Sequence, residues 1–157
     1  MASRACNDHI PTFYRIVFTI LDPIVAAWGA YMNFCTPEFV LNAFIPASLL
    51  PYQPLQGFLM HQIGGALCMC VMLDLFLLRQ TNEVWIWKRV QIAQLVYDVA
   101  LLWSTYYSLR QQGRLNIEGI RSEDWGGLAI TGGFAIVRTA FCLRVGSSGN
   151  KQMVKLS

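Results

Sequence analysis

Charged residues are scarce in this chain. Aspartate, glutamate, lysine and arginine together make up only 13% of its 157 residues, whereas hydrophobic residues make up 55%. A soluble domain normally has about a quarter of its residues charged, and a short domain has a large surface to cover. The composition therefore favours a protein whose apolar side chains face lipid. The net charge of +3 is small and scattered, which argues against nucleic-acid binding because that function needs a dense basic face.

Familiar cofactor and metal motifs are also missing. The chain has no GxGxxG, HExxH or GxSxG pattern. Its five cysteines are an odd number without any CxxC pair, and we expect them to behave as small apolar residues. The sequence therefore predicts no cofactor and no bound metal.

Four apolar stretches are long enough to cross a bilayer. About 20 helical residues span roughly 30 Å of hydrocarbon, and helices are favoured there because lipid offers the backbone no hydrogen-bond partners. We predict one all-α domain over residues 1–157, a four-helix transmembrane bundle with a Pro-rich interfacial loop between the first two helices and a disordered tail at 146–157. The predicted helices cover about residues 11–34, 55–78, 84–109 and 125–145.

Proline shapes two parts of this prediction. Pro23 lies within the first span, where it should kink the helix or leave a backbone carbonyl without its helical donor. The segment from Cys35 to Pro54 contains four prolines among apolar residues, which preclude another spanning helix there. We expect this segment to lie in the membrane interface and to cover one mouth of the bundle.

The basic residues favour one orientation. Four spans place both termini on the same side, and the positive-inside rule puts that side in the cytosol. We therefore expect a multi-pass protein of the endoplasmic reticulum. A transporter is disfavoured because four spans lack the usual repeated halves, unless a homodimer supplies them. The cytosolic side collects Arg4, Arg15, Arg79, Lys88, Arg89, Arg144, Lys151 and Lys155, and the opposite side has Arg110, Arg114 and Arg121.

Every predicted span carries at least one ionisable residue inside its apolar stretch. These residues are Asp22, then His61 and Asp74, then Asp98, then Arg138. A charge at a helix centre costs roughly 2.5 to 3.5 kcal/mol, and such residues usually face the interior, pair with one another and mark function. The helical rise puts Asp98 about 10 Å deeper than Asp22, Asp74 and Arg138. We therefore expect Arg138 to lie between Asp22 or Asp74 on one side and Asp98 on the other.

Two interpretations of this set are open. Arg138 could simply neutralise one aspartate and clamp the bundle, His61 could be a structural hydrogen-bonding residue, and Asp74 could reach toward water. Three carboxyl groups for one buried arginine instead favour catalysis, because in a low dielectric one can stay protonated as an acid while another is ionised. For Asp124, which lies at a predicted helix start, we expect a capping role.

Short motifs spread over nearly the whole chain are shared with a known family. They are Tyr14-Arg15, Asp22-Pro23, Gly29-Ala30-Tyr31, the segment Leu77–Trp85, Tyr97-Asp98, Asp124-Trp125-Gly126 and Arg138. In these motifs the chain resembles small fungal four-helix membrane proteins, some of them found in secondary-metabolite gene clusters. The resemblance extends to epoxide hydrolases of polyene-pyrone pathways of the aurovertin and citreoviridin kind. It implies an activity that opens polyene-derived epoxides, without indicating which residues catalyse.

The residues are compatible with that activity. Opening an epoxide needs an acid on the departing oxygen and either a base for water or a carboxylate nucleophile. The leading hypothesis is a membrane-embedded, cofactor-independent epoxide hydrolase or cyclase whose partners are an epoxidised polyene substrate and membrane lipid. Asp98 and Asp22 are the expected acid and base (or nucleophile), Arg138 organises them, and His61 and Asp74 are secondary candidates.

Two other classes remain open. One is a terpene cyclase or sterol-type isomerase that works by protonation, in which Trp28, Trp103 and Tyr106 could stabilise a carbocation. The other is a non-enzymatic membrane protein that binds lipid or holds other enzymes at the membrane.

Overall fold

The computed structural model describes residues 10–116 and 119–146, and these residues form helices and connecting segments without any strand. The all-α prediction is therefore confirmed for the described part of the chain. In chain order the elements are α1 (Thr12–Ile16), η1 (Val17–Leu21), α2 (Asp22–Cys35), α3 (Pro37–Phe44), η2 (Pro54–Gln56), α4 (Gly57–Met72), η3 (Leu73–Leu78), α5 (Val84–Gln111) and α6 (Ser122–Cys142).

Three of the described helices are long and apolar enough to cross a membrane. They are Thr12–Cys35, Pro54–Leu78 and Ser122–Cys142, which agrees with a membrane protein. The long helix α5 has 28 residues, but it does not meet the same criterion of apolarity. The polar residues responsible include Lys88, Arg89, Gln91, Gln94 and Asp98.

The first spanning helix runs continuously through α1, η1 and α2. Pro23 has no N–H to donate, so the carbonyl of Thr19 lacks its normal helical partner. Arg79, at the end of η3, supplies the missing donors from Nε at 3.1 Å and from Nη2 at 2.6 Å. The turn that precedes Asp22-Pro23, η1, is π-helical, a rare form that occurs mostly as single turns inside α-helices. The predicted free carbonyl is thus present and partnered.

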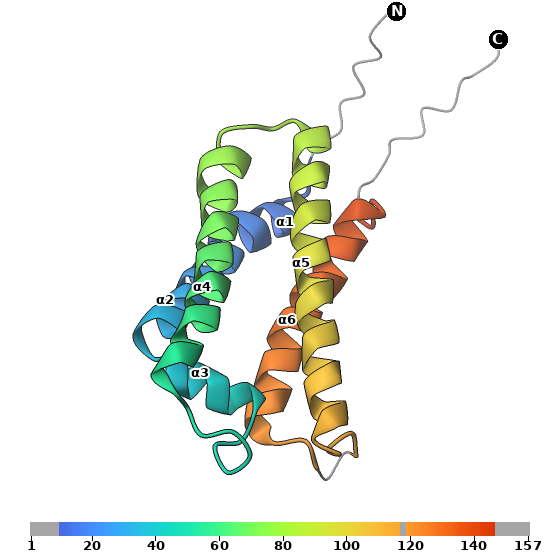
Figure 1. The fold of residues 1–157 in the computed structure, drawn as a ribbon. Helices are drawn as coiled ribbons and strands as arrows, with labels where there is room; N and C mark the ends of the chain where they lie inside the picture. The colour runs from blue at the N-terminus through green and yellow to red at the C-terminus, as the bar shows by residue number, and fades with distance from the viewer. Residues whose placement is uncertain (1–9, 117–118, 147–157) are drawn as a thin grey trace, which may run out of the picture.

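The predicted Pro-rich loop contains a helix that sequence reasoning missed. Residues 37–44 form α3, which begins with Pro37, a position where a missing N–H costs nothing because the first N–H groups of a helix have no internal partner. This helix lies across the end of the bundle opposite the start of α1 and the C-terminal end of α6 (Figure 1). It contacts α2, α4 and α6.

Two side chains fasten the end of α3 to the neighbouring helices. Arg121, just before α6, donates from Nη2 to the carbonyls of Asn42 at 2.9 Å and Ala43 at 3.1 Å. Gln112, just after α5, donates from Nε2 to the carbonyl of Phe44 at 3.2 Å. The carbonyls at a helix end have no helical donors of their own, so these bonds fix α3 in place.

The helix boundaries agree closely with the predicted ones. The largest differences are in α6, which begins at Ser122 rather than 125 and ends at Cys142 rather than 145. Residues 147–157 of the predicted tail, with its two lysines, lie outside the described residues, as does Arg4. The segment just after α6 contacts α1, where the hydroxyl of Tyr14 donates a hydrogen bond to the carbonyl of Val145 at 2.8 Å.

Candidate functional site

Ionisable side chains from three helices meet inside the bundle. Arg138 on α6 donates from Nη2 to Oδ2 of Asp22 on α2 at 2.6 Å, and from Nη1 to Oδ2 of Asp98 on α5. The residues Asp22, Asp98 and Arg138 are only 4%, 7% and 3% exposed. The structure therefore brings together the three residues that we expected to meet, with Arg138 between the two aspartates.

Helical spacing explains why these side chains point inward. On α5, Gln91, Gln94 and Asp98 are separated by three and four residues, which places them on one face, and all three are buried. Gln91 completes the binding of the guanidinium, since Nε of Arg138 donates to its Oε1 at 3.2 Å. The ring of Phe134, about one turn away on α6, lies 5.4 Å from Cζ of Arg138, within the range of a cation–π contact.

Asp74 lies near this cluster but binds a different partner. It is completely buried, so the alternative that it reaches toward water is wrong. Nε2 of Gln94 donates to its Oδ1 at 2.9 Å, whereas its Oδ2 has no hydrogen-bond partner among the described residues. Asp74 therefore keeps one oxygen free for a proton or for another molecule.

Several buried polar atoms of the interior are likewise without a partner among the described residues. They include Oδ1 of Asn33, Nε2 of Gln91, Oε1 of Gln94 and the hydroxyl of Tyr97. A buried donor or acceptor that makes no hydrogen bond costs about 1 to 3 kcal/mol, and native proteins contain few of them. These atoms are potential hydrogen-bond donors and acceptors in the interior of the bundle.

His61 does not belong to the site. It is exposed on α4, with its ring centroid 5.5 Å from that of Phe34. Asp74 is thirteen positions after His61, which corresponds to a rotation of about 220° beyond full turns, so the two side chains face different sides of the helix. The structure therefore does not bring His61 together with the other predicted site residues.

The aromatic residues proposed for a carbocation site are also placed elsewhere. Trp28, Trp103 and Tyr106 are exposed on the outer faces of α2 and α5. They therefore cannot surround an intermediate held by the buried aspartates. This arrangement removes the support that the cyclase or isomerase alternative drew from them.

Asp124 has the expected capping role. Its Oδ2 accepts a hydrogen bond from the backbone N–H of Arg121 at 2.9 Å and another from the guanidinium of Arg114. These contacts hold the beginning of α6 against the connection from α5. Asp124 is therefore occupied structurally and is separate from the Arg138 cluster.

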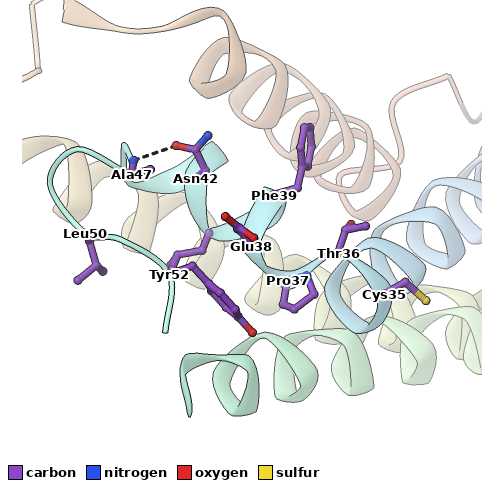
Figure 2. Close-up of a pocket in the computed structure, with 10 residues that line it drawn as sticks. Cys35, Thr36, Pro37, Glu38, Phe39, Asn42, Ala47, Leu50 and Tyr52 are labelled. Carbon is purple, nitrogen blue, oxygen red and sulfur yellow. Dashed lines mark hydrogen bonds between the residues drawn. The ribbon is translucent and has the colours of Figure 1, made fainter. Parts of the chain in front are cut away.

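An apolar cavity of about 720 Å³ lies farther along α5 than the cluster, and none of Asp22, Asp98 and Arg138 lines it. It lies between α3 with its following segment, α4 and α5, and one of its lining residues, Leu101, is one helical turn from Asp98. A second pocket of about 540 Å³ lies beyond α3 and is lined by Glu38, Asn42 and Tyr52 among others (Figure 2). Leu41 and Leu50 line both spaces. Sequence reasoning missed the cavity because it depends on α3.

A protein family matches residues 7–148, almost the entire chain. The chain belongs to this family, the domain of unknown function DUF7704. No curated protein and no solved structure is similar enough to match. The function of this DUF7704 protein therefore has to be argued from its own residues.

In this DUF7704 protein the buried carboxyl groups in and near the cluster outnumber its one cation. Asp22, Asp74 and Asp98 provide three carboxyl groups against the one guanidinium of Arg138, and uncompensated charge is costly in a low dielectric. The set is therefore suited to hold protons on some carboxyl groups while Arg138 keeps another ionised. Chemically, this provides a proton donor and a proton acceptor in one buried place. The described residues contain no group of three or more metal-binding side chains.

Proposed function

We propose that this DUF7704 protein is a membrane-embedded, cofactor-independent enzyme that opens epoxides on an apolar polyene polyketide in fungal secondary metabolism. The observation that carries the proposal is the position of Arg138 between two buried aspartates. An apolar cavity lies farther along α5, where Leu101, one turn from Asp98, is among its lining residues. The resemblance of its motifs to epoxide hydrolases of polyene-pyrone pathways supports the choice of substrate.

The reaction uses Asp98 as acid and Asp22 as base. The protonated carboxyl group of Asp98 gives its proton to the epoxide oxygen as the carbon–oxygen bond breaks. The carboxylate of Asp22 takes a proton from water as the water oxygen bonds to carbon, and the product is a vicinal diol. When a hydroxyl group of the substrate attacks instead, the product is a cyclic ether. Transfer of the proton from Asp22 back to Asp98 restores the starting state.

Arg138 organises this exchange. Its guanidinium donates to both carboxyl groups at once, so it can stabilise whichever one is negative at each stage. Gln91 holds the guanidinium through Nε. Asp74, with one free oxygen, is a secondary candidate that can accept or return a proton.

In this proposal all four long helices cross the membrane of the endoplasmic reticulum and both termini are cytosolic. The one long helix that does not meet the criterion of apolarity, α5, buries Gln91, Gln94 and Asp98, while Val96 and Val99 on its other side are exposed. This polarity fits a helix that turns its polar face to a bundle and its apolar face to lipid. The segment around α3 then lies in the membrane interface on the lumenal side.

The test measures conversion of a polyene bis-epoxide by microsomes in oxygen-18 water. We expect wild-type protein to form diol that carries the label, or an unlabelled cyclic ether. Asp98→Asn should lower the rate by about 10²- to 10⁴-fold, the usual contribution of a positioned acid or base. The matched control is Glu83→Gln, which makes the same chemical change at an exposed carboxyl group.

Two results would refute the proposal. An Asp98→Asn protein that accumulates normally and forms as much product as wild type would remove the catalytic role. Failure of the wild-type protein to convert any epoxide would favour a lipid-binding or scaffolding protein whose aspartates and arginine serve only to clamp the bundle.

A further inference from the structure

We infer that the cavity between α3, α4 and α5 is a binding site for an uncharged, elongated amphiphile. Its apolar part would lie against α3 and α4, and its polar end would form hydrogen bonds with α5. The volume of about 720 Å³ is within the range of known small-molecule sites. The apolar wall is formed by residues that include Leu41, Phe44, Ile45, Leu59, Met60 and Ile63.

The α5 side of the cavity has a row of polar side chains. Their positions, which follow the helical repeat, place them on one face. Ser108 accepts a hydrogen bond from Nε2 of Gln112 at 2.8 Å and can still donate its own proton. A ligand hydroxyl or carbonyl can therefore replace water here without leaving a polar group unpaired. The row consists of Ser104, Thr105, Ser108, Gln111 and Gln112.

The electrostatics of the cavity select against charged ligands. Among the described residues that line it, none is charged. A neighbouring space of about 160 Å³ shares Thr105 with the cavity and is lined by Glu123 and Asp124, and the carboxylate of Asp124 is already paired with Arg114 and Arg121. The guanidinium of Arg114 reaches Oε1 of Gln112 at 2.7 Å, but it is paired with Asp124. A carboxylate or phosphate head would lose its hydration here without gaining a free cation.

These features distinguish the ligand from bilayer lipid. Phospholipids and fatty acids carry ionised heads, whereas a neutral alcohol, ketone or lactone matches a row of hydroxyl and amide groups. The orientation of the ligand rests on the proposed function. Ser108 is ten residues from Asp98 along α5, or about 15 Å, so the reacting group and the polar head of a substrate should be separated by about that length.

The binding test compares two fluorescent polyenes with the same hydrocarbon body. Purified protein in phosphatidylcholine nanodiscs is titrated with retinol or with retinoic acid, and the signal of empty nanodiscs is subtracted. We expect saturable binding of one retinol per chain and about tenfold weaker binding of retinoic acid, which corresponds to roughly 1.4 kcal/mol.

Matched variants locate the site. Ile63→Trp fills the cavity and should weaken retinol binding about tenfold, whereas Ile130→Trp, on the exposed face of α6, should leave it unchanged. Ser108→Ala is the second variant in case Ile63→Trp does not fold, and it should weaken retinol binding while retinoic acid is hardly affected.

The possible outcomes separate this inference from the proposed function. Equal or tighter binding of retinoic acid, or equal effects of the two tryptophan variants, would overturn the inference. The absence of saturable retinol binding above the nanodisc background would do the same. Selective binding of retinol without conversion of any epoxide would leave the site standing and refute only the proposed enzymatic activity.

Discussion

Replacing Arg138 with methionine tests whether the bundle depends on its buried charges. Arg138→Met keeps a long unbranched side chain but removes the donors to Asp22 and Asp98. Gln91 loses the donor to its Oε1 as well. The carboxyl groups then remain buried without a cation, while the change in packing is small.

The expected cost is large. Removing one partner of a buried ion pair typically destabilises a protein by about 3 to 5 kcal/mol because the other charge is left uncompensated. A domain of ordinary stability has only about 5 to 15 kcal/mol in total. We therefore expect Arg138→Met to lower the free energy of unfolding by about 3 to 5 kcal/mol, measured by SDS titration of the purified protein in mixed micelles.

The triple variant Arg138→Met, Asp22→Asn, Asp98→Asn provides the decisive comparison. It removes the guanidinium and both ionisable carboxyl groups, and neutral replacement of a buried ion cluster is often tolerated. We expect it to recover most of the stability lost in Arg138→Met, with no epoxide conversion. The reasoning would be refuted if Arg138→Met were as stable as wild type, or if the triple variant were as unstable as the single one.

Two further predictions concern the packing of the first two long helices, with stability again measured by SDS titration. Gly64→Leu should lower the free energy of unfolding by about 1 to 3 kcal/mol, because a Cβ at this position would lie 2.9 Å from the ring of Phe34. The control is Gly65→Leu, which should be nearly neutral because a Cβ there meets no atom within 4 Å. Equal effects of the two variants would contradict the observed contact. Arg79→Met should cost about 1 to 3 kcal/mol, because it removes the donors to the carbonyl that Pro23 leaves open. Adding Pro23→Ala should recover part of this loss by restoring a helical N–H, and strictly additive effects would contradict this explanation.

The helices were predictable because their signals are local. A long apolar run indicates a helix, and the polar residues before it indicate where the helix begins. These polar residues are Thr81-Asn82-Glu83 before α5 and Ser122-Glu123-Asp124 at the start of α6. The structure places the start of α5 at Val84, as predicted. The helix α3 was missed because four prolines argue against a long helix, although one of them is well suited to begin a short one.

The candidate site was predictable only in part. Depth along each helix follows from the rise per residue, and it correctly suggested that Arg138 lies between aspartates of two other helices. The rotation of each helix about its axis does not follow from depth. His61 therefore turned out to face outward, and Asp74, at a depth similar to that of Asp22, pairs with Gln94 rather than with Arg138.

By itself, the sequence determined that the chain is helical, that many of its apolar side chains can face lipid, and that its apolar stretches contain ionisable residues that need partners inside the protein. These properties depend on composition and on spacing along the chain. Only the tertiary structure decided which aspartates share Arg138 and that α3, α4 and α5 together line an apolar cavity. The physical reason is that both depend on how residues distant in sequence pack against one another, since the contacts between helices set their rotation and the position of α3.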